Sequence, residues 1–315
     1  MKGMLLGALG AVLMLGQDVA ASPVRMHKTG TIDELIVEAN PIVFKGHPYL
    51  CEYIRKKYPG NAGGRSYFRF LDMADMKTVV STCGHGLHMG NAFVDGDRVV
   101  VTCVEDWGAP RFYQIESTDL VHWTEPRQIL EGEGWKGYNT SVCRAGDRYV
   151  MVFELGAPKE MVGTMFTMFF AESKDLGTWT LIDGARMGAD RYTGAPMLRH
   201  YGDWFYFFHL EGSYEEGFET RVMRSKDLYA WERSPHVVLG YDPWDKMIHP
   251  RANFTDAEKA YIAGAKDVNA SDLDMCDWNG KLVCFYSWGN QRGNEFSALA
   301  EADCTEREFC ESFFN

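Results

Sequence analysis

The sequence predicts an all-β protein folded as a five-bladed β-propeller with four-stranded antiparallel blades, and two repeats running in step support this. The first repeat is the signature S-[T/K]-D-L-x-x-W, whose three copies begin at Ser117, Ser173 and Ser225, 56 and 52 residues apart. A signature recurring at such an interval marks a repeated supersecondary unit. Its Ser and Asp can bond the backbone of a turn, its Leu anchors that turn, and its Trp packs on a neighbouring layer.

The second repeat is a hairpin. Five apolar segments each reach a glycine turn and continue into a β-prone strand. They start at Pro41, Asn91, Ser141, Pro196 and Leu273, and their turn glycines are Gly46, Gly96, Gly146, Gly202 and Gly280. Glycine adopts the positive φ that tight hairpins need. We therefore expect each blade to hold a hairpin of strands A and B, a third strand, and an outer strand after the Trp. Five blades closed in a ring leave only short sheet edges.

The domain organisation follows from length and spacing. The chain has 315 residues, of which 46% are hydrophobic and 14% aromatic, so it can bury a large core. All-β domains of this length are commonly single units, and we expect one domain over residues 22–315. The last glycine interval is longer than the others, which predicts an insertion of roughly two dozen residues between Gly240 and Asn269. The longest segment with helical periodicity is Thr255–Ala265.

The N-terminus predicts export. Lys2 precedes an apolar stretch, Met4 to Gly16, that is too short for a stable bilayer span, and small residues follow at Ala20 and Ala21. We expect a signal peptide over residues 1–21, with a retained membrane anchor as the alternative. The mature protein would be secreted or periplasmic, with no membrane partner after cleavage. A net charge of −12 argues against a nucleic-acid partner.

The eight cysteines indicate neither a disulfide scaffold nor a metal site. Their density is low, and a core of this size needs no covalent cross-links. Cys51, Cys103 and Cys284 fall within expected B strands, where buried free thiols are favoured. Cys304 and Cys310 are the best pair if any disulfide forms. No Cys or His cluster has zinc spacing, so no metal ligand is predicted.

Carboxylates predict where the chemistry lies. The start of strand A and the end of strand B share one end of each blade, so five such ends form one funnel. Glu52, Glu154 and Glu211 each end a very apolar run, and Asp272 opens strand A of the fifth blade. A carboxylate there is costly unless it faces a polar cavity or a partner, and a structural ion pair is the alternative for each. Converging carboxylates suit glycosidic bond cleavage, in which one protonates the leaving oxygen and another activates water or attacks the sugar.

Catalytic roles can be assigned from local sequence. Glu211 follows WFYFFHL, and burial against that run should raise its pKa, as a general acid requires. Asp272 or Glu154 would then be base or nucleophile, with Glu52 tuning the others. Arg191 and Arg251 could clamp an anionic substituent, with ordinary salt bridges as the alternative. Trp107, Trp244 and Trp288 offer faces for stacking on a carbohydrate substrate. The predicted substrate-binding residues are Asn40, His88, Asn139, Arg191, His249, Arg251, Asp274, Trp288 and Gln291.

With these motifs, the chain resembles the five-bladed propeller glycoside hydrolases of families 43, 32, 62 and 117 and the related mannoside phosphorylases. The resemblance runs from about Asn40 to Phe314. It rests on the S-x-D-L-x-x-W copies, the glycine hairpins and the segment YTGAPMLRHYGDWFYFF from Tyr192. The segment from Asn269, NASDLDMCDW, looks like the closing blade of secreted members. The resemblance implies a glycosidase in a propeller funnel. These families can carry an axial calcium, but no contiguous ligand motif here supports it, and no cofactor is predicted.

Three positions depart from the family pattern. The resembling families place acids at the positions of Asn40, Asn139 and Gly194, where this chain has none. Catalysis could have moved to the carboxylates named above, which is the interpretation we favour. Two alternatives stay open. The chain could be an inactive carbohydrate-binding propeller, or a glycoside phosphorylase, which would need a cationic pocket for phosphate.

Overall fold

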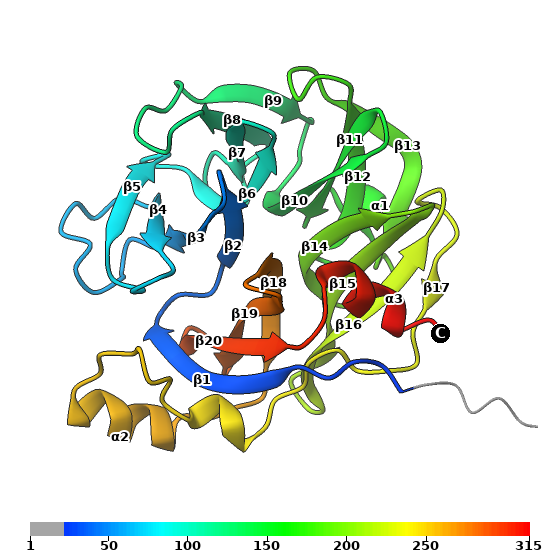
Figure 1. The fold of residues 1–315 in the computed structure, drawn as a ribbon. Coiled ribbons are helices and arrows are strands. Elements are labelled where there is room, and N and C mark those ends of the chain that lie inside the picture. The colour runs from blue at the N-terminus through cyan, green and yellow to red at the C-terminus, as the bar shows by residue number, and fades with distance from the viewer. Residues whose placement is uncertain (1–21) are drawn as a thin grey trace, which may run out of the picture.

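The predicted five-bladed propeller is confirmed in the computed structural model, which describes residues 22–315 (Figure 1). The predicted signal peptide lies outside the described residues. Blade 1 consists of β2 (Ala39–Phe44), β3 (His47–Ile54), β4 (Tyr67–Asp72) and β5 (Val79–Cys83), and blade 2 of β6 (His88–Asp95), β7 (Arg98–Val104), β8 (Arg111–Ser117) and β9 (Arg127–Glu131). Blade 3 consists of β10 (Gly137–Ala145), β11 (Arg148–Leu155), β12 (Thr167–Ser173) and β13 (Thr180–Met187). Blade 4 consists of β14 (Thr193–Tyr201), β15 (Trp204–Ser213), β16 (Gly217–Ser225) and β17 (Glu232–Arg233).

Blade 5 closes the ring with a strand from the other end of the chain. It joins β18 (Ala270–Trp278), β19 (Lys281–Gly289) and β20 (Glu295–Ala302) to β1 (His27–Glu34), which pairs antiparallel with β20. The five A strands, β2, β6, β10, β14 and β18, are innermost, as expected (Figure 1). The closing strand was not predicted from sequence. Because β1 pairs with β20, the backbone N–H and C=O groups along that side of β20 are hydrogen-bonded instead of forming an open sheet edge.

The S-x-D-L-x-x-W motif builds the same turn each time. In the first copy, Ser117 Oγ accepts from the Leu120 amide at 2.8 Å, and Asp119 Oδ1 accepts from the two following amides at 2.8 Å. Leu120 is buried with φ 60°, a conformation that these bonds hold in place. A divergent copy that the sequence did not reveal occurs in blade 1. There Asp75 Oδ1 accepts from the amides of Lys77 and Thr78, and Met76 has φ 56°.

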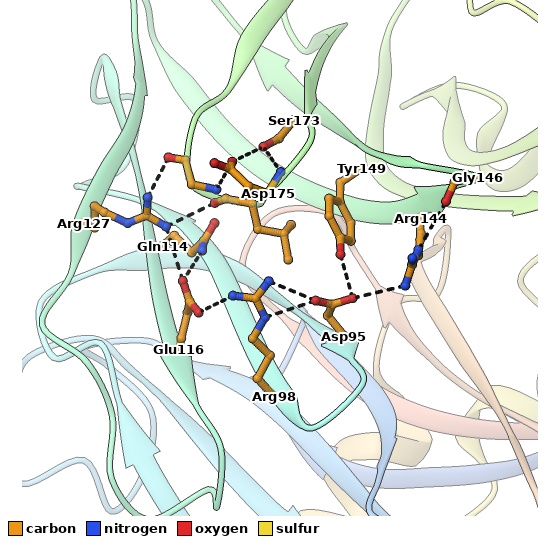
Figure 2. A network of polar contacts seen from close by, with 12 residues as sticks. Asp95, Arg98, Gln114, Glu116, Arg127, Arg144, Gly146, Tyr149, Ser173 and Asp175 are labelled. Carbon is orange, nitrogen blue, oxygen red and sulfur yellow. Dashed lines mark hydrogen bonds and ion pairs between the residues drawn. The ribbon is translucent and has the colours of Figure 1, made fainter.

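These turns also join neighbouring blades. Arg127 of blade 2 donates to the Gly177 carbonyl in the turn of blade 3 at 2.6 Å and to Glu116 at 3.3 Å, and the pair of Arg127 and Glu116 can be followed in Figure 2. Arg98 bonds both Glu116 and Asp95, and Asp95 accepts from Tyr149 of blade 3 at 2.9 Å. As predicted, the motif tryptophan packs on the next layer. The Trp123 ring stacks on Phe70 of blade 1 with centroids 5.1 Å apart.

The predicted insertion before blade 5 contains a 3₁₀ turn, η1 (Pro243–Lys246), and α2 (Asp256–Gly264), which lies outside blade 5 (Figure 1). Asp245 of η1 is buried and forms an ion pair with Lys28 of β1 at 2.7 Å, so the insertion fastens the closing strand. Two short helices complete the fold, α1 (Lys159–Val162) and α3 (Glu306–Ser312). All eight cysteines are free, including Cys304 and Cys310. None of the described helices is long and apolar enough to span a membrane.

Gly30 makes ring closure testable. It has φ 113°, and a Cβ there would collide with the Met247 carbonyl of the insertion. We expect Gly30→Ala to destabilise the protein by roughly 2–4 kcal/mol, because both the backbone conformation and the packing oppose the methyl group. Gly264→Ala in α2 is the matched control, since no atom lies within 4 Å of its added Cβ. Thermal unfolding measures both variants. Equal melting temperatures for the two would contradict this role for β1.

Candidate active site

The innermost strands are irregular at one end of the propeller. The pairing of strands A and B shifts register between His88 and Asn91, Gly137 and Thr140, Gly194 and Met197, and Ser271 and Asp274. Within these bulges Met89, Ala195 and Asp272 have φ of 52°, 53° and 50°. Left-handed conformations are costly for residues other than glycine and cluster at functional sites. The bulges thus mark this end of the ring as the candidate site.

A pocket of about 380 Å³ opens at this end. Its lining residues come from all five blades and are Val37, Glu38, Arg55, Met89, Trp107, Asn139, Glu154, Met165, Phe166, Tyr192, Gly194, Ala195, Leu210, Tyr214, Asp272, Gln291, Gly293 and Glu295. Trp107, Met165 and Tyr214 are about half exposed and supply apolar surface at the rim. Four carboxyl groups and an aromatic rim in one cavity provide both acid–base groups and a platform for a sugar ring.

The carboxyl group of Glu154 lies beside Gly194 of the next blade. Its Oε1 lies 3.7 Å from where a Cβ on Gly194 would stand. The two carboxylate oxygens accept from the amides of Ala195 at 2.6 Å and Asn139 at 3.2 Å. Burial, and then the charge of Asp272, raise the pKa of Glu154 well above its ordinary value. Strand B of blade 3 therefore places a carboxyl group beside the start of strand A of blade 4.

Asp272 sits on the strained bulge of β18. Ser271 Oγ donates to its Oδ2 at 2.6 Å. Burial, and then the charge of Glu38, raise the pKa of Asp272 to about 8. The group therefore holds a proton at neutral pH and can donate it, as a general acid must.

Glu38 is the anionic neighbour, and sequence reasoning missed it. Arg55 Nη2 lies 3.1 and 3.2 Å from its two carboxylate oxygens, and Arg55 Nη1 lies 3.7 Å from Glu295. Burial raises the pKa of Glu295, although Arg55 opposes this. The sequence carries only weak signals for these three residues. Glu38 precedes the first strand A, Arg55 follows an apolar strand, and Glu295 opens a strand that carries no motif.

The predicted site residues divide into two groups. Glu154, Asp272, Asn139 and Gln291 line the pocket, as does Trp107. The main-chain carbonyl of Gln291 accepts from the Tyr214 hydroxyl at 3.2 Å. The other predicted site residues do not line the pocket; they are Glu211, Glu52, His88, Arg191, His249, Arg251, Asn40, Asp274 and Trp288.

The pKa predicted for Glu211 is wrong. His209 Nε2 donates to its carboxylate at 3.2 Å, Arg233 lies 2.9 Å away and Arg191 3.5 Å away. The bond from His209, followed by these positive charges, lowers the pKa of Glu211 to about 2. Glu211 therefore forms a structural ion pair, which was the alternative to a catalytic role in the sequence analysis. Arg191 forms ion pairs with both Glu211 and Asp190.

Glu52 and His88 are buried outside the pocket. Glu52 faces the interface between blades 1 and 5, where it is bound by Arg69. His88 bonds the Tyr53 hydroxyl at 2.6 Å and Ser66 Oγ at 3.0 Å. Because protein groups bind the polar atoms of both buried side chains, these contacts fit structural roles better than direct contact with a substrate.

The remaining predicted binders lie in the insertion, the core or the channel. Arg251 donates to the Met73 carbonyl at 3.0 Å, and the His249 amide bonds Thr31 of β1. Trp288 is fully buried, and its Nε1 donates to Thr31 Oγ1 at 2.8 Å. None of these three residues lines the pocket at which a sugar contact was predicted.

Asn40 and Asp274 lie deeper in the central channel. Asn40 Oδ1 accepts from the Ala92 amide at 2.6 Å, and Asp274 is bound by Arg199 and by Asn91 Nδ2. Because these oxygens already have protein donors, they do not fit an axial calcium site. Over residues 22–315 no group of three or more His, Cys, Asp or Glu side chains could hold a metal.

Comparison with solved structures supports the fold. The chain matches the family 43 protein BlXynB from Bacillus licheniformis (16% identity, TM-score 0.54) over 88% of this chain and 54% of that one. It matches a xylan β-1,4-xylosidase from Bacillus halodurans (13%, 0.57) over 90% and 55%, so it spans about half the length of these two proteins. It matches the catalytic domain of a family 62 α-L-arabinofuranosidase from Coprinopsis cinerea (10%, 0.61) over 91% and 99%. No family model and no curated protein matches the sequence. The fold is thus that of the five-bladed propeller glycoside hydrolases.

The raised pKa of Asp272 predicts how stability depends on pH. The folded state holds this proton up to pH of about 8, whereas the unfolded chain loses it near pH 4. The stability contributed by this proton is complete below the unfolded pKa and is lost as pH rises through the folded pKa. We expect Asp272→Asn to raise the melting temperature at pH 8, by roughly 2–4 °C per kcal/mol, and to change it little at pH 4.

Glu211→Gln is the control of opposite sign. Because the pKa of Glu211 is lowered, its contribution is present at neutral pH and lost as pH falls toward about 2. We expect this variant to be less stable at pH 7. Scanning calorimetry from pH 4 to 8 measures both. If Asp272→Asn lowered the melting temperature at pH 8, the assignment of a raised pKa would be wrong.

Proposed function

We propose that the chain is a glycoside hydrolase acting in the pocket at the bulged end of the propeller. The observation that carries this is the pairing of Asp272, a carboxyl group with raised pKa, with Glu38, a carboxylate bound to Arg55, beneath an aromatic rim. A protonated carboxyl group beside a second carboxyl group that is bound to a cation is an arrangement that glycosidic cleavage can use. We further propose export through the N-terminal sequence.

In this proposal Asp272 protonates the leaving oxygen, and Glu38 takes a proton from water or attacks the anomeric carbon. Glu154, held by two backbone amides, bonds a sugar hydroxyl near Gly194. Trp107 and Tyr214 contact the apolar face of the ring. This differs from our expectation from sequence, in which Glu211 was the acid, because Glu211 is ion-paired outside the pocket.

A panel of chromogenic glycosides tests the proposal. Because the fold neighbours include a xylosidase and an arabinofuranosidase, 4-nitrophenyl xylosides and arabinofuranosides come first, followed by hexosides and natural oligosaccharides. We expect turnover of at least one member by the wild-type protein and by Glu211→Gln. In Asp272→Asn we expect turnover of natural oligosaccharides to be lost, because their sugar leaving groups need protonation, whereas 4-nitrophenyl glycosides need little. Cleavage of a natural oligosaccharide that survives in Asp272→Asn would place the chemistry elsewhere.

A carbohydrate-binding propeller without catalysis is the second candidate. Its support is that Asn40, Asn139 and Gly194 replace the acids of the resembling families. Calorimetric binding of an oligosaccharide with no release of reducing ends over days would favour it. A phosphorylase is less well supported, because Arg55, the cation among the lining residues, is already bound to Glu38 and close to Glu295. Release of a sugar phosphate that depends on added phosphate would favour that reaction.

A further inference from the structure

The interface between blades 5 and 1 buries a row of hydroxyl groups. Ser271 of β18 pairs in register with Ser287 of β19, Ser287 with Ser297 of β20, and Ser297 with Asp33 of β1. All three serines are buried. Side chains paired in register lie on the same face of a sheet, with Cβ atoms about 4.5–5.5 Å apart. The three hydroxyls and the carboxylate therefore form one line across blade 5.

This line faces Glu52 of blade 1. On the same face of β19 as Ser287, Phe285 packs with Leu50 and Ile54 of β3. Glu52 lies between those two residues in the alternation of β3 and so points to the same interface. Arg69 donates to Glu52 and, at 3.1 Å, to Asp33. Arg69 thus holds Glu52 at the Asp33 end of the row.

The other end of the row reaches the pocket. Ser271 Oγ donates to Asp272 Oδ2 at 2.6 Å and accepts from Asn269 Nδ2 at 3.0 Å. Within residues 22–315, the hydroxyls of Ser287 and Ser297 are buried without a hydrogen-bond partner. Buried hydroxyls are normally bonded, and alanine would fill such positions at lower cost if packing alone mattered. Two of them in line between two carboxyl groups suggest a shared role.

We propose that the hydroxyl groups of Ser271, Ser287 and Ser297 form a proton relay from Glu52 to Asp272. This rests on the proposed function, in which Asp272 is the general acid, and on the route in which Glu38 activates water, since after attack by Glu38 the second step would return a water proton to Asp272 directly. A sugar filling the pocket would screen Asp272 from bulk solvent, so a route through the blade interface would restore its proton before the product leaves. Glu52 is then a positioning and relay residue that does not touch the substrate.

Each proton in the proposed cycle has a source and a destination. Asp272 gives its proton to the leaving oxygen and becomes a carboxylate. Ser271 passes its hydroxyl proton to Asp272 and receives one from the next hydroxyl, so each serine ends unchanged. Glu52 supplies the proton and becomes a carboxylate opposite Arg69. It regains a proton from solvent at the Asp33 end, where Asp33 is 24% exposed. Glu38 releases to solvent the proton that it takes from the attacking water, so the uptake at Glu52 and the release at Glu38 balance over one turnover.

The groups around both ends are compatible with transfer. Glu38, Glu154, Glu295 and Arg55 line the same pocket as Asp272. Arg69, Asp33 and Tyr58 surround Glu52, with Tyr58 bonded to Asp33 at 2.8 Å. Burial raises the pKa of Glu52 to about 7, against the attraction of Arg69. Donor and acceptor thus titrate in the same pH range, as transfer in both directions requires.

The test replaces Ser287 and Ser297 together. We expect the double alanine variant to lose roughly tenfold or more in kcat, part of a general acid's usual contribution, with KM within about twofold. The double threonine variant keeps both hydroxyls and should recover most of that loss. Ser141→Ala is the control, since Ser141 is a buried serine outside the row that accepts from the Leu198 amide. An unchanged kcat with a higher melting temperature in the double alanine variant would mean dry packing and overturn the relay.

A readout without turnover separates this inference from the proposed function. Infrared bands of the protonated carboxyls are assigned with Asp272→Asn and Glu52→Gln. The relay predicts that the Asp272 band shifts in the double alanine variant and in Glu52→Gln. If the bands shift but no glycoside is cleaved, the hydrogen-bonded link stands and the proposed function fails. If turnover is present and the Asp272 band is unchanged in both variants, the relay is wrong.

Discussion

Asp272→Asn should lower kcat by ~100-fold or more on the best natural oligosaccharide of the panel, the usual contribution of a general acid. The amide keeps the size and the contact with Ser271 but has no proton to give to a leaving alkoxide. Substrates with strongly acidic phenol leaving groups need little protonation, so the loss should be smaller for them. Steady-state kinetics on matched aryl glycosides measures this difference.

Glu211→Gln is the matched control for that experiment. Like Asp272→Asn, this variant changes a carboxyl group to an amide. The side chain of Glu211, however, is paired with His209 and Arg233 outside the pocket. We expect kcat within about threefold of wild type, because it removes no group that reaches the substrate. Equal losses in the two variants would show that both act through stability and not through chemistry.

Glu38→Ala should also lower kcat by ~100-fold or more, and added formate should restore part of it, because a small carboxylate can occupy the space left by the side chain. A second consequence follows from charge. The anion of Glu38 raises the pKa of Asp272, so Glu38→Gln should move the alkaline limb of kcat/KM below pH of about 8. The pH–rate profile measures this shift directly.

Glu295→Gln controls for the loss of an Arg55 partner. Arg55 Nη1 lies 3.7 Å from Glu295, whereas its Nη2 binds both oxygens of Glu38. We expect Glu295→Gln to cost less than about tenfold in kcat, since Glu38 remains bound and anionic. Formate rescue of Glu295→Gln, or its absence in Glu38→Ala, would contradict the role assigned to Glu38.

The blades were predictable because their signals are local. The turn motif encodes its own hydrogen bonds, and the hairpin glycines encode a positive φ, which the structure shows at Gly46 and Gly280 (76° at both). The closing strand carries no such signal. β1 pairs with β20 at the other end of the chain, and only the unsatisfied edge of β20 explains its place.

The site was predictable only in part, because one sequence pattern covers two environments. Glu154 and Glu211 both end apolar B strands, yet the register differs. Phe153 pairs with Thr140 and Phe208 with Met197, so His209 is the counterpart of Glu154, and Glu211 lies two residues further along. Glu154 is also held in its position by the amides of Ala195, in the next blade, and Asn139. Neither the register nor the neighbour across blades can be read from local sequence.

The most direct test of the central claim is a crystal structure of Asp272→Asn with an oligosaccharide from the panel. We predict a sugar ring in the pocket, stacked on Trp107 or Tyr214, with its glycosidic oxygen within hydrogen-bond distance of the side chain at position 272 and its anomeric carbon facing Glu38. An oligosaccharide bound elsewhere, such as at the exposed Trp244 of the insertion, with this pocket unoccupied, would contradict the account.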